Sequence, residues 1–110
     1  MAEERGDSSL ADLGRFSEPA LLILISLADG DKHGYAMIED IRSVAGVRLG
    51  PGTLYGAIAR LESRGLIEAL APDERRNPYR LTAAGERSLR RRLRSLVAVT
   101  AVGEQRLARA

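Results

Sequence analysis

The residues best suited to binding an anion are three arginines that lie close together in one charged segment. They are Arg75, Arg76 and Arg80. The planar guanidinium group of arginine matches the oxygen geometry of a phosphate, so this segment favours contact with a phosphate backbone. Runs of charge often do no more than face solvent, and for each of these arginines that alternative stays open.

A second group of candidates follows the turn Gly50-Pro51-Gly52, in a helix expected over residues 53–64. The spacing of its leucine and isoleucine residues predicts one buried face and places Thr53, Tyr55 and Arg60 on the opposite side. An exposed tyrosine at a helix start can bond a phosphate or stack on a base, although packing on the neighbouring helix is the alternative for Tyr55. The expected buried face comprises Leu54, Ile58 and Leu61. Small residues on the exposed side, which would let the helix approach a duplex closely, are Gly52, Gly56 and Ala57.

Lys32, His33 and Tyr35 form a third group at the start of the preceding helix, expected over residues 34–44. The free N–H groups and the positive dipole end of a helix favour a phosphate at this place. His33 is the only histidine, so a multi-histidine metal site is excluded, and a cap or surface position is the alternative role. The buried stripe of this helix is expected to comprise Tyr35, Ile38, Ile41 and Ala45.

Several classes of chemistry are excluded by what the sequence lacks. There is no cysteine, and hence no disulfide, thiolate metal site or cysteine nucleophile. No carboxylate has the spacing of a metal site, and Gly50-Pro51-Gly52 lacks the lysine and the hydroxyl residue of a phosphate-binding P-loop. We therefore expect no enzyme activity, no metal and no cofactor.

The charges are separated along the chain although the net charge is only +2. Residues 1–71 carry seven basic and eleven acidic residues, whereas residues 72–110 carry ten basic and four acidic ones. The second half is where an anionic partner is expected. The N-terminal segment is acidic and polar where a signal peptide would be basic and then apolar, and no apolar run approaches the length of a membrane span. We expect a soluble, cytoplasmic protein of one domain.

The N-terminal part of the chain is expected to contain a flexible arm followed by a buried helix. Residues 1–16 are charged and polar, with at most a short helical turn. Ser17 is a good N-cap for a helix that runs to about Ala28, and Pro19 is tolerated in its first turn. Apolar residues surround this helix on all sides, so we expect it to be the central helix of the core.

Short strands and a charged hairpin are expected around the later helices. Gly46 is expected to end the helix that begins near residue 34, and Val47–Leu49 alternates as a short strand would. Residues 66–70 and 79–81 are the two strands of a predicted hairpin, and residues 71–78 form its charged tip.

A long helix is expected from Ala83 to near the end of the chain, with Thr82 as its N-cap. It carries a heptad seam of residues spaced alternately by four and three positions: Leu89, Leu93, Leu96, Thr100, Gly103 and Leu107. A seam that extends past the core needs a partner, and a second copy of the chain is the simplest one. We expect a homodimer through these residues; the alternative is a long helix lying on its own domain.

This order of elements is typical of a winged helix-turn-helix, a mainly α (α+β) fold with a two-stranded hairpin as the wing. In that geometry the helix after the turn lies in the DNA major groove, and the charged wing reaches the adjacent minor groove.

Three segments resemble the PadR family of transcriptional regulators. The first and longest is Leu49 to Ile67, with Thr-Leu-Tyr, Arg-Leu-Glu and Gly-Leu-Ile in order. The second is His33-Gly34-Tyr35, and the third is Asp73 to Gly85, which resembles the wing and the start of the dimerisation helix of that family. Together they span about residues 17–95.

The resemblance implies a bacterial, sequence-specific DNA-binding repressor that acts as a homodimer on a pseudo-palindromic operator. It divides the chain into the arm (1–16), a DNA-binding domain (17–82) and a dimerisation helix (83–110). The last helix has no aromatic residue to stack on a planar ligand. A small-molecule effector is possible, and the sequence does not identify one. The alternative is a winged-helix module that binds a protein partner and does not read DNA. A face serving that purpose would be more apolar and less basic.

Overall fold

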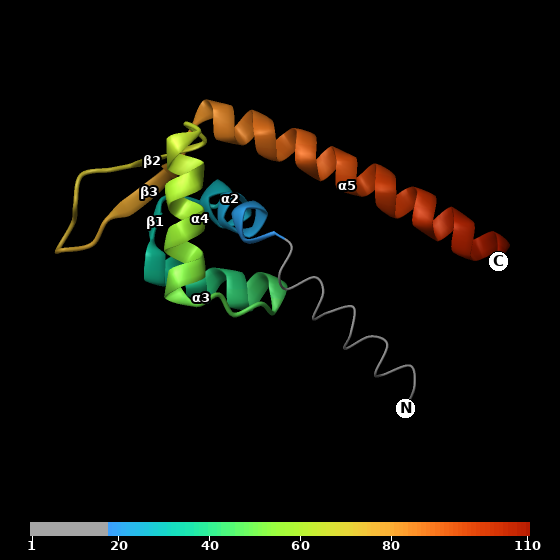
Figure 1. Ribbon diagram of the computed structural model, residues 1–110, viewed down its shortest axis with the longest axis horizontal. Coiled ribbons are helices and arrows are strands. Elements are labelled where there is room, and N and C mark those ends of the chain that lie inside the picture. The colour runs from blue at the N-terminus through green and yellow to red at the C-terminus, as the bar shows by residue number, and fades with distance from the viewer. Residues whose placement is uncertain (1–17) are drawn as a thin grey trace.

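The computed structural model of the protein describes residues 18–110 (Figure 1). Its elements in chain order are α2 (Pro19–Ala28), β1 (Lys32–His33), α3 (Gly34–Ala45), α4 (Pro51–Ser63), β2 (Ile67–Ala69), β3 (Pro78–Leu81) and α5 (Ala83–Arg109). The strands form one antiparallel sheet in the order β1-β3-β2. The predicted fold class is confirmed. The predicted arm at 1–16 and cap at Ser17 lie outside the described residues.

Prolines define where two of the helices begin. Pro19 is the first residue of α2 and Pro51 the first residue of α4. The missing N–H of proline is not needed in the first turn, and its fixed φ suits that position. Helix α4 therefore starts two residues before the predicted Thr53, with Gly50 as its extended N-cap. Helix α3 ends with its C-cap at Gly46, which adopts the predicted left-handed conformation with φ of 68°.

The strand predicted at Val47–Leu49 is wrong. These residues pair with no strand, and the Leu49 side chain is instead buried in the core. The third strand of the sheet is β1, where Lys32 pairs with Tyr79 and His33 with Pro78. A short alternating segment becomes a strand only where a free edge meets it, and β1 takes the free edge of β3.

The buried stripe of α3 is also shifted from the prediction. Met37 and Ile41 are buried with Gly34, whereas Tyr35 is 67% exposed and Ala45 faces solvent. Positions 34, 37 and 41 follow the three-and-four spacing of a helical face, so Tyr35 falls on the adjacent, outward side. Ile38 packs at the edge of the core, as predicted.

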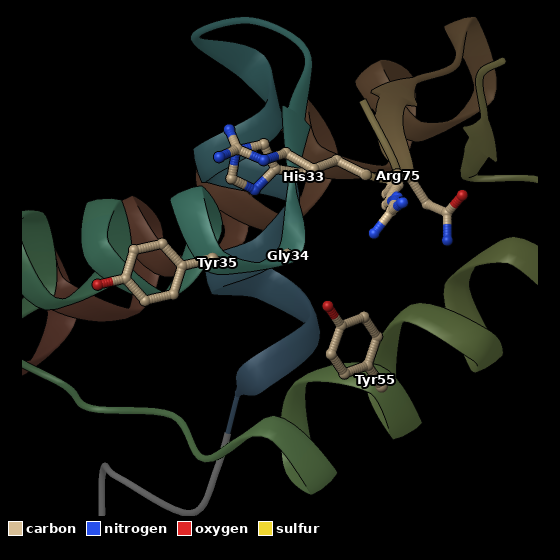
Figure 2. A pocket seen from close by; sticks show the side chains of 7 residues that line it. His33, Gly34, Tyr35, Tyr55 and Arg75 are labelled. Carbon is tan, nitrogen blue, oxygen red and sulfur yellow. The ribbon is translucent and has the colours of Figure 1, made fainter. Parts of the chain in front are cut away.

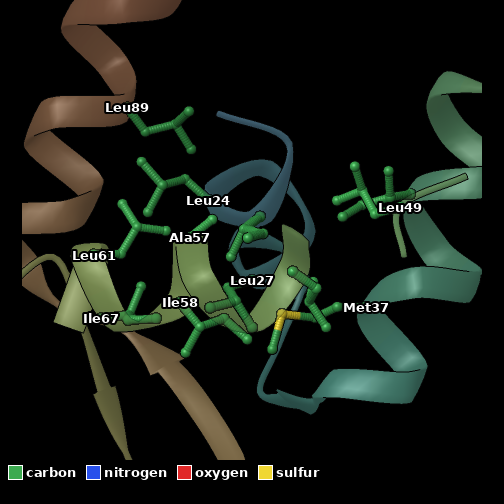
Figure 3. Packing of buried hydrophobic residues seen from close by; sticks show 12 residues of the cluster. Leu24, Leu27, Met37, Leu49, Ala57, Ile58, Leu61, Ile67 and Leu89 are labelled. Carbon is green, nitrogen blue, oxygen red and sulfur yellow. The ribbon is translucent and has the colours of Figure 1, made fainter. Parts of the chain in front are cut away.

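The core forms around α2, which packs against α3, α4, α5 and β3 as its all-round apolar sequence predicts (Figure 3). From α2 it includes Ile23, Leu24 and Leu27. Its partners from α4 are Leu54, Ala57, Ile58 and Leu61. One polar group is buried among them. The Ser26 hydroxyl donates to Oδ2 of Asp40 at 2.6 Å, which joins α2 to α3.

Helix α5 starts on the hairpin and then leaves the body (Figure 1). Thr82 caps it as predicted, with Oγ1 accepting the Gly85 N–H at 3.0 Å. Gly85 lies against the carbonyl of Leu66, where a β-carbon would collide. Leu89 is buried in the core of its own chain. At 27 residues, α5 is about 40 Å long, so most of it extends past that anchor.

Candidate nucleic-acid interface

A cleft of about 270 Å³ lies where the start of α3, the first turns of α4 and the tip of the wing come together (Figure 2). The term wing denotes the hairpin of β2 and β3 with residues 70–77 between them. The cleft is lined by His33, Gly34, Tyr35, Tyr55, Arg75, Arg76 and Asn77. Five candidate residues from three separate parts of the sequence are therefore brought to one place: His33, Tyr35, Tyr55, Arg75 and Arg76.

Tyr55 both packs on the neighbouring helix and faces solvent. Its ring leaves α4 toward Gly34 at the start of α3, and its side chain is 50% exposed (Figure 2). Tyr35 contributes to the cleft wall, but its ring points away from the cleft. Of the two tyrosines proposed from the sequence, Tyr55 is the one whose hydroxyl faces the cleft.

The tip of the wing is a tight turn built from residues that disfavour it. Asp73 and Arg76 exchange two backbone hydrogen bonds of 2.9 and 2.8 Å across the turn. Between them, Glu74 and Arg75 have φ of 47° and 70°. Two consecutive left-handed residues are the signature of a type I′ turn, where asparagine and glycine are preferred. This backbone places the Arg75 and Arg76 side chains at the cleft.

His33 stands between α3 and the wing. Its Nδ1 accepts the Ala36 N–H at 3.4 Å, which makes it the N-cap of α3 and confirms the capping role considered from the sequence. Its Nε2 lies 3.2 Å from Nη1 of Arg76. A guanidinium only donates, so Nε2 must accept in that contact, which leaves the proton of a neutral ring on Nδ1. A neutral His33 ring has one acceptor nitrogen, so it can form only one of these two hydrogen bonds at a time.

A second hollow of about 290 Å³ shares His33 and Arg76 with the cleft. Its charged lining residues are Asp31, Lys32, Asp73, Glu74 and Arg76. The carboxylates make this hollow unfavourable for a phosphate, so the cleft that contains Tyr55 is the better anion site. Within residues 18–110, no group of three or more histidine, cysteine or acidic side chains is arranged to hold a metal ion.

The side chains of Lys32 and Arg80 bind groups of their own chain. Lys32 Nζ donates to the Ser26 carbonyl at 2.5 Å, at the C-terminal end of α2, and lies 3.6 Å from the Asp29 carboxylate. Its side chain is only 16% exposed. The Arg80 Nε donates to Oε1 of Glu68 at 2.9 Å, and this bond raises the pKa of the Arg80 guanidinium. Neither cation lines the cleft, and the DNA contact expected of each stays a prediction.

The remaining candidates lie along α4. Thr53 and Arg60 are exposed, and a β-carbon at Gly52 would meet open space. Ala57 is fully buried, so the prediction that it faces outward is wrong. It lies three residues after Leu54, on the same face of the helix.

Two residues of the cleft were not assigned from the sequence. The sequence indicates a turn at Asn77 and the opening of a helix at Gly34, and both stand in segments that resemble the PadR family without a role of their own there. Neither residue type carries a charge or a reactive group, and nothing in the spacing of the sequence marks them. They line the cleft only because the wing and α4 meet the start of α3 there.

The outer part of α5 exposes an unpartnered apolar surface. Leu89 is buried in its own chain, so the predicted seam is open only from Leu93 onward. The large exposed apolar side chains on this part of α5 are Leu93 and Leu107, which lie on the predicted seam, and Val97, Val99 and Val102, which lie off it. Despite the length of α5, no helix in the described part of the chain is apolar over enough residues to cross a bilayer.

The chain matches known regulators over most of the domain described above. A family model described as the transcriptional regulator PadR-like family matches residues 23–91. An uncharacterized 37.1 kDa protein in transposon TN4556 of Streptomyces fradiae is 46% identical over 74% of this chain, which spans 24% of that protein. The transcriptional regulator Rv3488 of Mycobacterium tuberculosis is 37% identical over 69% of this chain and 73% of its own.

A solved structure shows the same likeness in three dimensions. A PadR family transcription regulator from Clostridium difficile R20291 superimposes with a TM-score of 0.74 at 29% identity, covering 81% of this chain and 97% of that one. The family model covers well over half of the chain, and it includes α3, α4, the wing and the start of α5. The chain belongs to the PadR-like family of transcriptional regulators.

Proposed function

We propose that the protein binds double-stranded DNA as a homodimer and represses transcription from a pseudo-palindromic operator. In this proposal residues 17–82 form the DNA-binding unit and residues 83–110 the dimerisation helix. The observation that carries it is the cleft that joins Tyr55 of α4 to Arg75 and Arg76 of the wing.

The charges at the cleft fit a phosphate backbone. Within residues 18–110, neither Arg75 nor Arg76 forms a salt bridge, whereas Arg42, Arg80, Arg90 and Arg92 are each paired with a glutamate. An arginine without a carboxylate partner can bind an anion without first giving up an ion pair within its own chain. With α4 in the major groove, the wing lies at its edge and reaches the adjacent minor groove, where arginine is favoured.

Dimerisation is supported by the exposed apolar residues of α5 beyond Leu89. A helix with this surface gains by burying it against a second copy, and a twofold axis then relates two α4 helices. Those helices would read half-sites about 34 Å apart, one turn of the duplex.

The test is a mobility-shift titration on the DNA upstream of the protein's own gene, at two salt concentrations and with competitor DNA. We expect a discrete complex that weakens steeply with salt because phosphate counterions are released. Tyr55→Ala and the double change Arg75→Ala/Arg76→Ala are expected to weaken it at least about fivefold, since each removes contacts worth about 1–3 kcal/mol. Arg91→Ala removes one charge from α5, outside the cleft, and serves as the control.

A different result would favour a protein partner. If only diffuse, salt-sensitive binding appears and the Tyr55→Ala protein behaves as the unmodified protein does, the DNA-reading role of the cleft is wrong. The same surface would then be tested for binding to a protein.

A further inference from the structure

We infer that Gly34 is a positioning residue for Tyr55. Because Gly34 has no β-carbon, the Tyr55 ring packs against the start of α3, and this contact holds the phenol hydroxyl in the cleft. The inference rests on the proposed function for the role of the cleft, but the packing it describes is independent of DNA.

The backbone conformation at Gly34 does not require a glycine. Gly34 is the first residue of α3 and is buried, and its φ lies outside the left-handed region that favours glycine. In a helix, alanine is preferred to glycine because it loses less backbone freedom on folding. A glycine is therefore unfavourable here unless the space beside it is needed.

The space beside Gly34 is filled by Tyr55. A β-carbon at Gly34 would lie 2.8 Å from Cζ and 3.2 Å from Cε1 of the Tyr55 ring, with the hydroxyl oxygen closer still. Gly52 is the matched contrast, since it also lies in the first turn of a helix, and a β-carbon there would meet nothing within 4 Å. The need for glycine at position 34 is thus specific to the tyrosine on α4.

The contact fixes where the hydroxyl stands. The ring rests against the start of α3, and the oxygen points along the cleft wall beside the wing side chains (Figure 2). A tyrosine already held in its binding rotamer loses less freedom when a ligand binds. With a β-carbon at position 34 the ring must turn away, and that advantage is lost together with the position of the hydroxyl.

A double-mutant cycle tests this inference. The four proteins are the unmodified chain, Gly34→Ala, Tyr55→Ala and the double variant; each is measured for operator affinity and for its thermal unfolding midpoint. We expect Gly34→Ala to weaken DNA binding about threefold to tenfold in the chain that has Tyr55, and not at all in the Tyr55→Ala chain. The unfolding midpoint should fall in the first background and stay level or rise in the second, where alanine only improves the helix.

Each other outcome has a definite meaning. If Gly34→Ala weakens operator binding equally with and without Tyr55, Gly34 acts through α3 alone. If it does not weaken binding in the chain that has Tyr55, the position of Tyr55 does not depend on Gly34. Either result overturns the inference. If Gly34→Ala fails to fold, folding of the double variant supports the inference, and its failure overturns it. If Tyr55→Ala leaves DNA binding intact, the proposed function of the cleft fails, whereas the unfolding midpoints still decide the packing. In the unfolding midpoint alone, Gly52→Ala controls for adding a methyl group to a first helical turn, since a β-carbon there meets nothing within 4 Å.

Discussion

At the scale of single residues, two cations proposed to contact DNA have opposite surroundings. Lys32 is held by the Ser26 carbonyl and lies close to Asp29, while Arg75 stands at the tip of the wing and lines the cleft. A cation at the C-terminal end of a helix stabilises the helix dipole and its free carbonyls. Lys32 therefore serves the junction of α2 with β1, and Arg75 is the residue directed toward a ligand.

This difference predicts a separation of stability from binding. Lys32→Met is expected to lower the free energy of unfolding by about 1–2 kcal/mol and to leave the salt dependence of DNA binding unchanged. Arg75→Met should do the reverse, leaving stability unchanged and reducing the salt slope by about one. Denaturant unfolding and salt titrations of the two variants check this. A reduced salt slope for Lys32→Met would return Lys32 to the DNA-binding surface.

Tyr79 predicts how stability changes at alkaline pH. Burial raises the pKa of its hydroxyl above the ordinary value of 10.0, with the negative charges of Glu62 and Tyr55 adding to the effect. The folded state thus holds the proton more tightly than the unfolded state. The stability from this group is complete below pH 10 and is lost as the pH rises through the raised pKa.

Tyr79→Phe removes that group, so the variant should lose less stability than the unmodified protein between neutral and alkaline pH. Thermal unfolding midpoints measured across this range test the prediction, together with the ultraviolet absorbance of tyrosinate. Parallel declines of the two proteins would show that Tyr79 ionises as freely in the fold as outside it.

What the sequence could predict of the site follows residue chemistry. It identified His33, Tyr55, Arg75 and Arg76 because charged and aromatic groups near turns have a recognisable use. It could not show that Lys32 contacts the Ser26 carbonyl or that Arg80 pairs with Glu68, because a cation looks the same in sequence whatever its partner is. Such partners depend on strand register and helix ends.

At the scale of elements, the wing combines an unfavourable turn with a useful side chain. Glu74 and Arg75 both adopt left-handed backbone conformations, which cost a residue other than glycine about 1 kcal/mol each. The same two positions carry the charges at the tip. The turn would be more stable with glycine, and only the side chains argue against it.

A matched pair of variants separates the two effects. Glu74→Gly and Arg75→Gly should each stabilise the protein by up to about 1 kcal/mol, because each relieves one left-handed residue. Only Arg75→Gly should weaken DNA binding, while Glu74→Gly removes a carboxylate and should leave binding equal or tighter. Unfolding curves and mobility shifts on both variants provide the measurement. Equal binding by the two would mean that the Arg75 side chain has no role.

The helices were predictable from the sequence to a greater extent than the short strands. Pro19, Pro51, Gly46 and Thr82 give start and stop signals that act locally, and the structure places helix ends at or beside them. β1 has only two residues and exists because it meets the edge of β3. A strand of two residues shows no periodicity in the sequence. The alternating residues Val47–Leu49 therefore gave the stronger strand signal.

At the scale of the whole molecule, α5 connects the proposed DNA-binding domain to its proposed second copy. Leu89 anchors the helix in the core, and the ion pair of Arg92 with Glu18 ties it to the start of α2. Beyond those anchors it projects from the body (Figure 1). The angle at which α5 leaves the domain therefore sets the distance between two α4 helices in a dimer, and with it the spacing of the half-sites.

The dimer can be tested by charge on one face of α5. Leu107 lies on the seam and is 77% exposed, while Gln105 is in the same turn, on the far side of the helix. Leu107→Arg should shift the protein toward monomers, because an arginine in an apolar seam loses burial and meets its own copy across the twofold axis. Gln105→Arg adds the same charge in the same turn, where basic residues suit the helix end, and should leave the dimer intact.

Sedimentation velocity gives the oligomeric state, and operator titrations give its consequence. A monomer can occupy only one half-site at a time, so Leu107→Arg should bind the full operator no more tightly than a single half-site, whereas Gln105→Arg should keep the advantage of the full site. If Leu107→Arg stays dimeric, the contact between copies lies nearer Leu93. If the unmodified protein is monomeric and still prefers the full operator, α5 does not set the half-site spacing.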